Sequence, residues 1–206
     1  MLQYLDKSMK GEYIMNILDK IQGKLKKIFS GNKNKSNAPF VQWIHKNITK
    51  THCFTCTSNH RRIFENNDDK PKIGADNHPF CECYYADVEQ KSVGSISSKG
   101  ILAPDVYLKA YGKLPDYYIT KEEAKEKYGW NPRRNTLAGK APGKMIGGDV
   151  YNNNDLKLPQ KEGRIWYECD VDYVSGNRGT CSRLYYSNDG LMFYTDHFKD
   201  KVYQIV

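Results

Sequence analysis

Four charged side chains in the last third of the chain have the types and spacing needed for acid–base chemistry on a phosphate ester: Glu168, Arg178, Arg183 and His197. They fall on short aromatic and β-branched segments between glycine-bearing turns, a pattern that predicts consecutive β-strands. Cleavage of RNA without a metal needs a base for the 2′-hydroxyl proton, an acid for the leaving 5′-oxygen, and cations for the charge that builds on phosphorus. One carboxylate, one imidazole and two guanidinium groups meet those needs.

The elements that must position these residues follow from the surrounding pattern. From Met145 onward, glycine-bearing turns separate five extended segments, which predicts an antiparallel sheet. Before it, residues 101–112 predict a helix, and Thr120 with Glu123 three residues later forms a capping box that opens a second one. Helices followed by a sheet indicate the α+β class. We place this domain at residues 97–206, after a small and polar stretch typical of a domain boundary.

Composition and charge limit the function classes. The 206 residues fit two small domains, and the mean hydropathy of −0.77 argues against a membrane span. The net charge of +8 suits a polyanionic partner, but residues 101–206 hold 16 Lys and Arg against 14 Asp and Glu, so attraction to RNA there must come from a local patch. The first residues lack the apolar core of a general signal peptide. If the protein is secreted or delivered into a target cell, we expect a dedicated route or a longer polypeptide.

In the first region, residues 1–96, the spacing of apolar residues over 12–30 predicts an amphipathic helix. A cysteine-rich stretch follows at residues 50–85. The stretch carries two close pairs, Cys53 with Cys56 and Cys81 with Cys83. Four thiolates spaced in this way predict a structural zinc site, with His78 as an alternative ligand. Disulfides, including a Cys169–Cys181 pair across a hairpin, and free thiols stay open as alternatives. The zinc would not be catalytic, because no H-E-x-x-H glutamate accompanies it.

Several motifs in residues 101–206 agree in order and spacing with one known family. LPDYYITKEEAKEKYGW, LAGKAPGKMIGGDVYNNNDLKLP, GRIWYECDVDYVSGNR and YYSNDGLMFYTDHF resemble the corresponding segments of barnase-type microbial ribonucleases. The resemblance implies helices packed on a five-stranded antiparallel sheet and a guanine-preferring endoribonuclease that needs no cofactor for catalysis. It assigns Glu168 as general base and His197 as general acid, with Arg178, Arg183 and Lys121 around the scissile phosphate. The segment between the two arginines is one residue longer than is usual in the family.

In this family a loop reads guanine with backbone N–H groups and a carboxylate. Here Asn152, Asn153 and Asn154 would form the loop, and Asp155 would supply the carboxylate. Asn154 replaces a family arginine and Asp155 a longer glutamate, so we expect a retained but weaker guanine preference. An asparagine-rich turn in left-handed conformations, with no ligand, is the alternative. Phe198, where the family commonly has tyrosine, is expected to stack on a base.

The cysteine-rich stretch resembles the C-terminal motif of phage minor head (head morphogenesis) proteins, with its C-x-x-C and HPxCxC elements. This resemblance implies an adaptor that carries a toxin domain. The expected partners are single-stranded RNA and an acidic, barstar-like inhibitor, and the chain is expected to be a monomer. One alternative is an inactive phage-like structural protein that only binds nucleic acid. Another, a zinc-dependent DNA-binding regulator, lacks a recognisable recognition helix.

Overall fold

The computed structural model describes residues 37–46, 54–74, 81–154, 157–173, 182–196 and 201–206. The chain divides into two compact units, Met1–Asn37 and Ala38–Val206. Apart from Asn37, the described residues belong to the second unit, and the helix predicted over residues 12–30 lies outside them. The domain boundary predicted near residue 97 falls inside the second unit and stays a prediction. No helix in the described part of the chain is both long and apolar enough to cross a bilayer.

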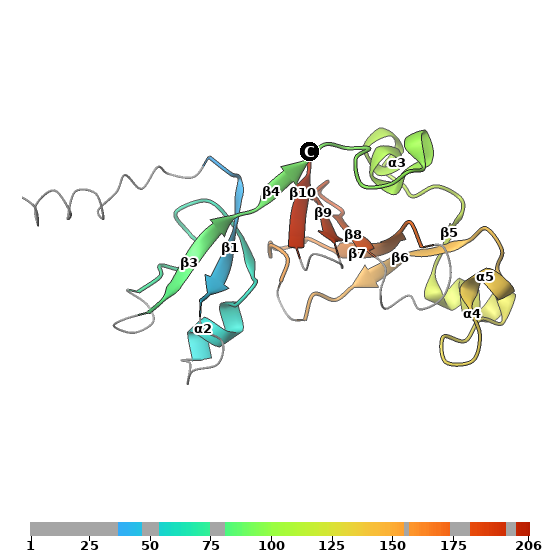
Figure 1. Cartoon of the computed structure of the whole chain (residues 1–206), viewed down its shortest axis with the longest axis horizontal. Helices are drawn as coiled ribbons and strands as arrows, with labels where there is room; N and C mark the ends of the chain where they lie inside the picture. The colour runs from blue at the N-terminus through green and yellow to red at the C-terminus, as the bar shows by residue number, and fades with distance from the viewer. Residues whose placement is uncertain (1–36, 47–53, 75–80, 155–156, 174–181, 197–200) are drawn as a thin grey trace, which may run out of the picture. The chain divides into compact units, whose positions relative to one another are not determined.

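A seven-stranded sheet dominates the second unit, with its strands in the order β4-β10-β9-β8-β7-β6-β5 (Figure 1). Its five middle strands are antiparallel neighbours: β6 (Met145–Tyr151), β7 (Trp166–Val171), β8 (Ser182–Ser187), β9 (Met192–Asp196) and β10 (Lys201–Ile205). At the two edges, β5 (Tyr118–Ile119) and β4 (Glu89–Lys91) pair in parallel with β6 and β10. The α+β class is confirmed, and the sheet has seven strands rather than the five expected.

The helices of the described part of the chain precede the five antiparallel strands of the large sheet. The expected helix over residues 101–112 is a 3-10 turn, η1 (Gly100–Leu102), followed by α3 (Pro104–Tyr111). α4 (Lys121–Tyr128) begins after Thr120, whose side chain accepts a hydrogen bond from the Glu123 backbone N–H. It ends at Gly129, whose φ of 65° lies in the left-handed region that favours glycine. A short helix, α5 (Leu137–Lys140), follows.

The side chains of the sheet alternate between two faces, and both faces are packed. On one face, Cys169 and Val171 of β7 pack with Leu184 and Met192 in a buried cluster. On the other face, Trp166 packs with Phe193. Because side chains two residues apart point the same way, Glu168 shares the face of Trp166. The functional candidate on β7 is therefore held by a strand that is packed on both sides.

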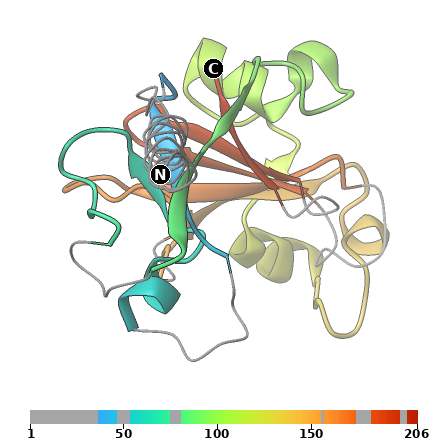
Figure 2. The same ribbon diagram turned by 60° about the vertical axis from the view of Figure 1, so that its left-hand side comes forward.

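The cysteine-rich region has a small sheet of its own, drawn in blue to green in Figure 2. It consists of β1 (Phe40–His45), β2 (Ile63–Glu65) and β3 (Cys83–Asp87) in the antiparallel order β2-β1-β3, with a helix, α2 (Phe54–Asn59). Its apolar side chains Phe40 and Ile63 pack in one cluster with Trp166 and Phe193 of the large sheet. The Ile63 N–H also donates to the Lys157 carbonyl at 2.8 Å. The cysteine-rich region thus covers apolar residues on the sheet face that carries Glu168.

Candidate functional site

Strand register brings three acidic side chains to one part of the large sheet. Glu168 and Asp170 lie two residues apart on β7 and share a face. Asp149 of β6 is the partner of Glu168, and Arg183 of β8 is the partner of Asp170. Burial is strong here: the exposed fraction is 9% for Glu168 and 1% for Asp170. Buried carboxylates require partners, and the neighbouring cations supply them.

Lys121 reaches Glu168 because it is the first residue of α4. Its backbone N–H donates to both carboxylate oxygens of Asp149, each at 3.1 Å, which fixes the start of the helix beside β6. Its side-chain Nζ contacts Glu168 Oε1 in a short ion pair. A carboxylate at a helix N-terminus also interacts favourably with the helix dipole. Asp149 is a positioning residue that was not predicted from the sequence, although it lies within one of the segments that carry the family resemblance.

Arg183 approaches the opposite side of Glu168. Its Nη1 lies 3.8 Å from Glu168 Oε2, and its Nε lies 3.7 Å from Asp170 Oδ1. Burial alone would lower the pKa of Arg183, but the Glu168 carboxylate, with smaller contributions from Tyr185 and Asp170, raises it above its ordinary value. Asp170 therefore helps hold the guanidinium in place. Asp170 was not among the residues predicted from the sequence, although its position two residues after Glu168 on the same strand places both side chains on one face.

Glu168 therefore lies between two cations, a lysine on one oxygen and an arginine near the other. A carboxylate held in this way can accept a proton, and the same cations can stabilise negative charge on a nearby phosphate. Among the five residues expected around the phosphate, the structure brings together Glu168, Lys121 and Arg183. Arg178 and His197 lie outside the described residues.

The loop expected to recognise a base is described in part. Asn153 is buried and has a φ of 48°, and its side-chain amide pairs with both the N–H and the carbonyl of Leu158 at 3.1 Å. It therefore holds the loop closed, and its left-handed backbone matches the alternative of an asparagine-rich turn. Asn152 and Asn154 are exposed. Asp155 and Phe198 lie outside the described residues.

A cleft of about 260 Å³ lies beside this loop. Tyr151 and Tyr185 line it with ring centroids 4.6 Å apart, and Lys157 adds a cation. Tyr185 is the strand partner of Glu168, so the cleft adjoins the charged cluster. A second cavity, of about 780 Å³, is lined by Tyr167 and Tyr186 among others. These two residues alternate with Glu168 and Tyr185 along their strands, so that cavity opens on the other face.

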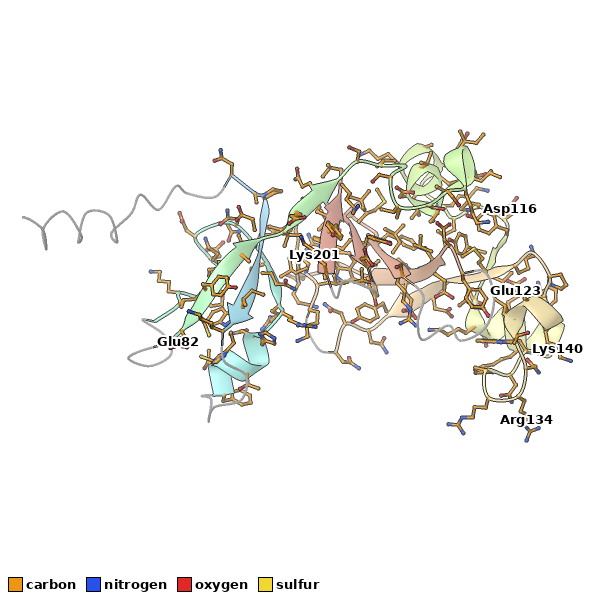
Figure 3. The ribbon with its side chains drawn as sticks, in the orientation of Figure 1. Glu82, Asp116, Glu123, Arg134, Lys140 and Lys201 are labelled. Carbon is orange, nitrogen blue, oxygen red and sulfur yellow. The ribbon has the colours of Figure 1, made fainter. Side chains whose placement is uncertain are left out.

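Exposed basic side chains also lie on the segment that joins α4 to the sheet. Arg133, Arg134 and Lys140 are all exposed. Figure 3 shows Arg134 and Lys140 at the α4–α5 end of the structure, where they point outward. This is a local concentration of positive charge within the nearly neutral second half of the chain, of the kind expected to attract a polyanion.

The cysteines of the upstream region gather in the small sheet. The Sγ atoms of Cys56 and Cys81 are 3.5 Å apart, and Cys83 packs against Cys56. His45 joins them, and sequence reasoning did not indicate this residue. Burial raises the pKa of the Cys83 thiol, while Cys56 and Trp43 oppose that effect. Cys53 and His78, also expected at this site, lie outside the described residues.

The alternative of a Cys169–Cys181 disulfide does not match the structure. Cys169 is a free thiol, fully enclosed in the core on the face opposite Glu168, and burial raises its pKa well above the usual value. Cys181 lies outside the described residues.

The fold and the charged cluster define a class: an α+β protein with an antiparallel sheet that presents a carboxylate between two cations, suited to proton transfer at a phosphate ester.

Comparison with known proteins identifies the family. A ribonuclease family model matches residues 103–205. The ribonuclease of Heyndrickxia coagulans is 50% identical over 93 residues, which cover 45% of this chain and 84% of that protein. The ribonucleases of Bacillus intermedius and Bacillus pumilus are also 50% identical over 93 residues, covering 45% of this chain and 56% of each relative.

The chain belongs to this ribonuclease family. The resemblance of residues 101–206 to barnase-type ribonucleases is therefore confirmed as membership of this family. The resemblance of the cysteine-rich stretch to phage minor head proteins stays a prediction.

Proposed function

We propose that the chain is an endoribonuclease that cleaves single-stranded RNA without a metal, by transesterification to a 2′,3′-cyclic phosphate followed by hydrolysis. The observation that carries this proposal is the position of Glu168 between Lys121 and Arg183 in a member of a ribonuclease family. The 2′-hydroxyl is the nucleophile, so DNA is not a substrate.

Each residue has a separate role in the proposed reaction. Glu168 takes the 2′-hydroxyl proton, and the new O–P bond displaces the 5′-oxygen. His197 donates a proton to that leaving oxygen, and the two residues exchange roles when water opens the cyclic phosphate. Lys121, Arg183 and Arg178 stabilise the negative charge on the phosphoryl oxygens. Asp149 and Asp170 hold the first two of these cations in place.

Cleavage of single-stranded RNA in EDTA tests this mechanism. Glu168→Ala and His197→Ala should both abolish turnover. Lys127→Met provides a matched control, because Lys127 forms an exposed (i, i+4) ion pair with Glu123 on the same helix as Lys121. Full activity in both the Glu168 and His197 variants would overturn the assignment. Binding of RNA without turnover by the wild-type protein would favour the inactive structural protein instead.

The specificity we propose is a weakened preference for guanine. Its support is the loop around Asn153, whose side chain holds the backbone closed next to a cleft with aromatic walls. Backbone N–H groups in such a loop can meet O6 of guanine, and Asp155 can accept from its N1 and N2 edge. Initial rates on four dinucleotides that differ only in the 5′ base measure the preference. Equal rates on all four would contradict it.

The biological role we propose is that of a toxin domain, delivered by a dedicated route and carried by the cysteine-rich adaptor. Degradation of cellular RNA would stop growth, so the producing cell would need an inhibitor. The two cations beside Glu168, Lys121 and Arg183, could pair with carboxylates of an acidic, barstar-like partner that covers the site of a monomeric enzyme. Induced expression in bacteria should arrest growth for the wild type and not for Glu168→Ala. Equal growth of both strains would count against a toxin.

A further inference from the structure

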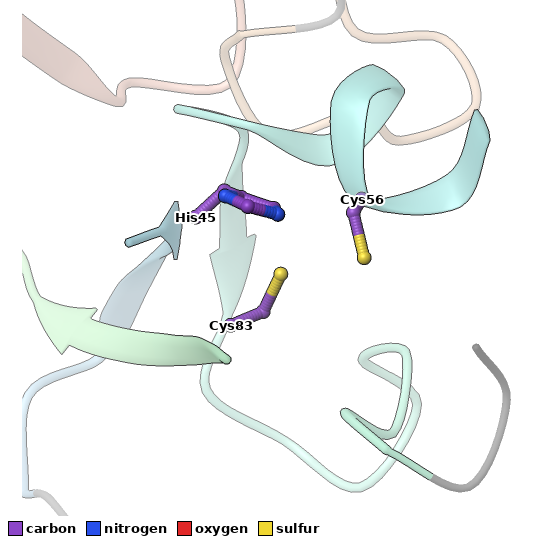
Figure 4. A group of neighbouring side chains, drawn as sticks. All are labelled: His45, Cys56 and Cys83. Atoms are coloured by element: carbon purple, nitrogen blue, oxygen red, sulfur yellow. The ribbon is translucent and has the colours of Figure 1, made fainter. Parts of the chain in front are cut away.

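Three described side chains from different elements of the small sheet point toward one another. His45 is the last residue of β1, Cys83 is the first residue of β3, and the two are strand partners. Cys56 comes from α2. Their ligand atoms all lie within 4.8 Å of one another, and Figure 4 shows the imidazole ring and the two sulfur atoms converging. Cys81 offers a fourth thiol, because its Sγ is 3.5 Å from that of Cys56, although it does not lie within 4.8 Å of all three ligand atoms.

The donor types and separations suit one metal in particular. Three thiols and an imidazole form one of the ligand sets of structural zinc sites, with Zn–S near 2.3 Å and Zn–N near 2.0–2.1 Å. Tetrahedral bonds of that length put neighbouring ligand atoms roughly 3.5–3.8 Å apart. The Cys56–Cys81 separation is within this range, and the three-residue group needs a contraction of about 1 Å at most. None of these three cysteines is joined to another described cysteine by a disulfide.

An independent observation concerns Trp43, two residues before His45. Its side chain is fully buried and packs with Cys56 and Cys83. Its indole N–H makes no close hydrogen bond among the described residues, but it lies near enough to the Cys83 thiol to lower the pKa of that thiol. A neutral thiol is a weak acceptor, whereas a metal-bound thiolate carries negative charge and accepts well. A metal-bound Cys83 thiolate would therefore be a better acceptor for this buried donor than the neutral thiol beside it.

A metal in this place would link elements of the small sheet beyond the apolar packing that it already has. Phe40 and Ile63 pack with Trp166 and Phe193 of the large sheet. Trp43, Cys56 and Cys83 form a separate buried cluster. One ion bound by these residues would tie together β1, α2 and β3, and four protein ligands leave no open position for catalysis.

We propose that Cys56, Cys81, Cys83 and His45 bind one structural zinc ion, and that His45 supplies the nitrogen ligand. The site is separate from the ribonuclease chemistry. It retains three of the four predicted thiolates and adds a histidine from β1 in place of Cys53 or His78.

The test is the zinc content of the purified full chain, with Co²⁺ as a spectroscopic substitute whose thiolate charge-transfer bands report bound sulfur. The wild type should hold one zinc per chain. Cys56→Ser and Cys83→Ser should lose it, and the matched control Cys169→Ser should keep it. His45→Ala should weaken zinc binding at least tenfold, and His45→Cys should restore it. Trp43→Phe, which removes the indole donor, should weaken it about 10- to 100-fold.

Three results would overturn the proposal. The first is a wild-type chain that binds neither zinc nor Co²⁺ after reduction. The second is His45→Ala with wild-type zinc affinity when Cys53→Ser or His78→Ala loses the metal, since that outcome would assign the fourth ligand elsewhere. The third is a Co²⁺ spectrum without thiolate bands. None of these readouts depends on RNA cleavage, so failure here leaves the proposed ribonuclease activity untouched.

Discussion

Replacement of Lys121 by methionine separates two roles that the lysine could have. The Lys121 ammonium contacts the Glu168 carboxylate in the free protein. When Glu168 takes a proton the carboxylate becomes neutral, and the negative charge appears on the phosphoryl oxygens instead. If Lys121 only paired with Glu168, its removal would make the carboxylate a stronger base and would not slow the reaction. If the Lys121 ammonium instead contacts the negatively charged phosphoryl oxygens in the transition state, its removal slows the reaction.

The magnitude follows from the type of contact. A hydrogen bond to a charged group contributes about 1.5–3 kcal/mol. Lost from the transition state, that amount lowers kcat by about 10- to 150-fold. Stability should change far less, by no more than about 1 kcal/mol, because the Lys121 side chain is 39% exposed and Arg183 remains beside Glu168. The substitution should therefore reduce catalysis without unfolding the protein.

Steady-state cleavage of a short RNA in EDTA, together with urea unfolding, measures both quantities. Lys127→Met is the control on the same helix and should keep the wild-type kcat. In a Glu168→Gln background, Lys121→Met should lower the residual rate further, because the phosphate charge is still present. Wild-type kcat in a folded Lys121→Met variant would refute the reasoning, and so would an equal loss of activity in Lys127→Met.

Three further predictions follow from individual contacts. Thr120→Ala removes the cap of α4 and should destabilise the fold by about 1 kcal/mol in urea unfolding. It should also lower kcat, because Lys121 is the next residue, and an unchanged kcat would contradict this. Gly147→Ala would place a Cβ 2.5 Å from the Cβ of Cys169. This overpacking should destabilise the fold by about 1–3 kcal/mol, and an unchanged urea midpoint would refute it. Burial raises the pKa of Tyr117 from 10.0 to about 12, so its contribution to stability is complete below pH 10 and is lost as the pH rises through about 12. Tyr117→Phe should therefore reduce the alkaline fall in thermal stability, and an identical fall in both proteins would contradict this.

The sequence predicted the part of the site that depends on local pattern. Alternation along one strand is enough to put Glu168 and Asp170 on the same face of the sheet, and the cap at Thr120 is enough to place Lys121 at the start of a helix. The role of Asp149 could not be predicted, because it depends on the β6–β7 register and on the irregularity between Gly147 and Asp149. Such pairings are set by tertiary packing rather than by local propensity.

The differences in the fold have the same origin. β4 is three residues long and polar, and it joins the sheet through backbone pairing with β10 and through polar contacts such as the hydrogen bond from Gln90 to Gln204, so no hydrophobic alternation marks it. The sequence separation between His45 and the cysteines likewise does not match a spacing typical of metal ligands. His45 reaches Cys83 because β1 and β3 are antiparallel partners, a long-range pairing that residue spacing does not reveal. The cysteine pairs could be recognised from sequence because each pair is local.

In the proposed mechanism, Glu168 removes the 2′-hydroxyl proton from RNA in the absence of a metal. An oligodeoxynucleotide with a single guanosine ribonucleotide, incubated in EDTA, tests this most directly. We expect cleavage only after the ribonucleotide, with a 2′,3′-cyclic phosphate as the first product, and a rate about 10²- to 10⁴-fold lower for Glu168→Gln. Cleavage of the all-deoxy control, a requirement for a divalent metal, or a wild-type rate for Glu168→Gln would contradict it.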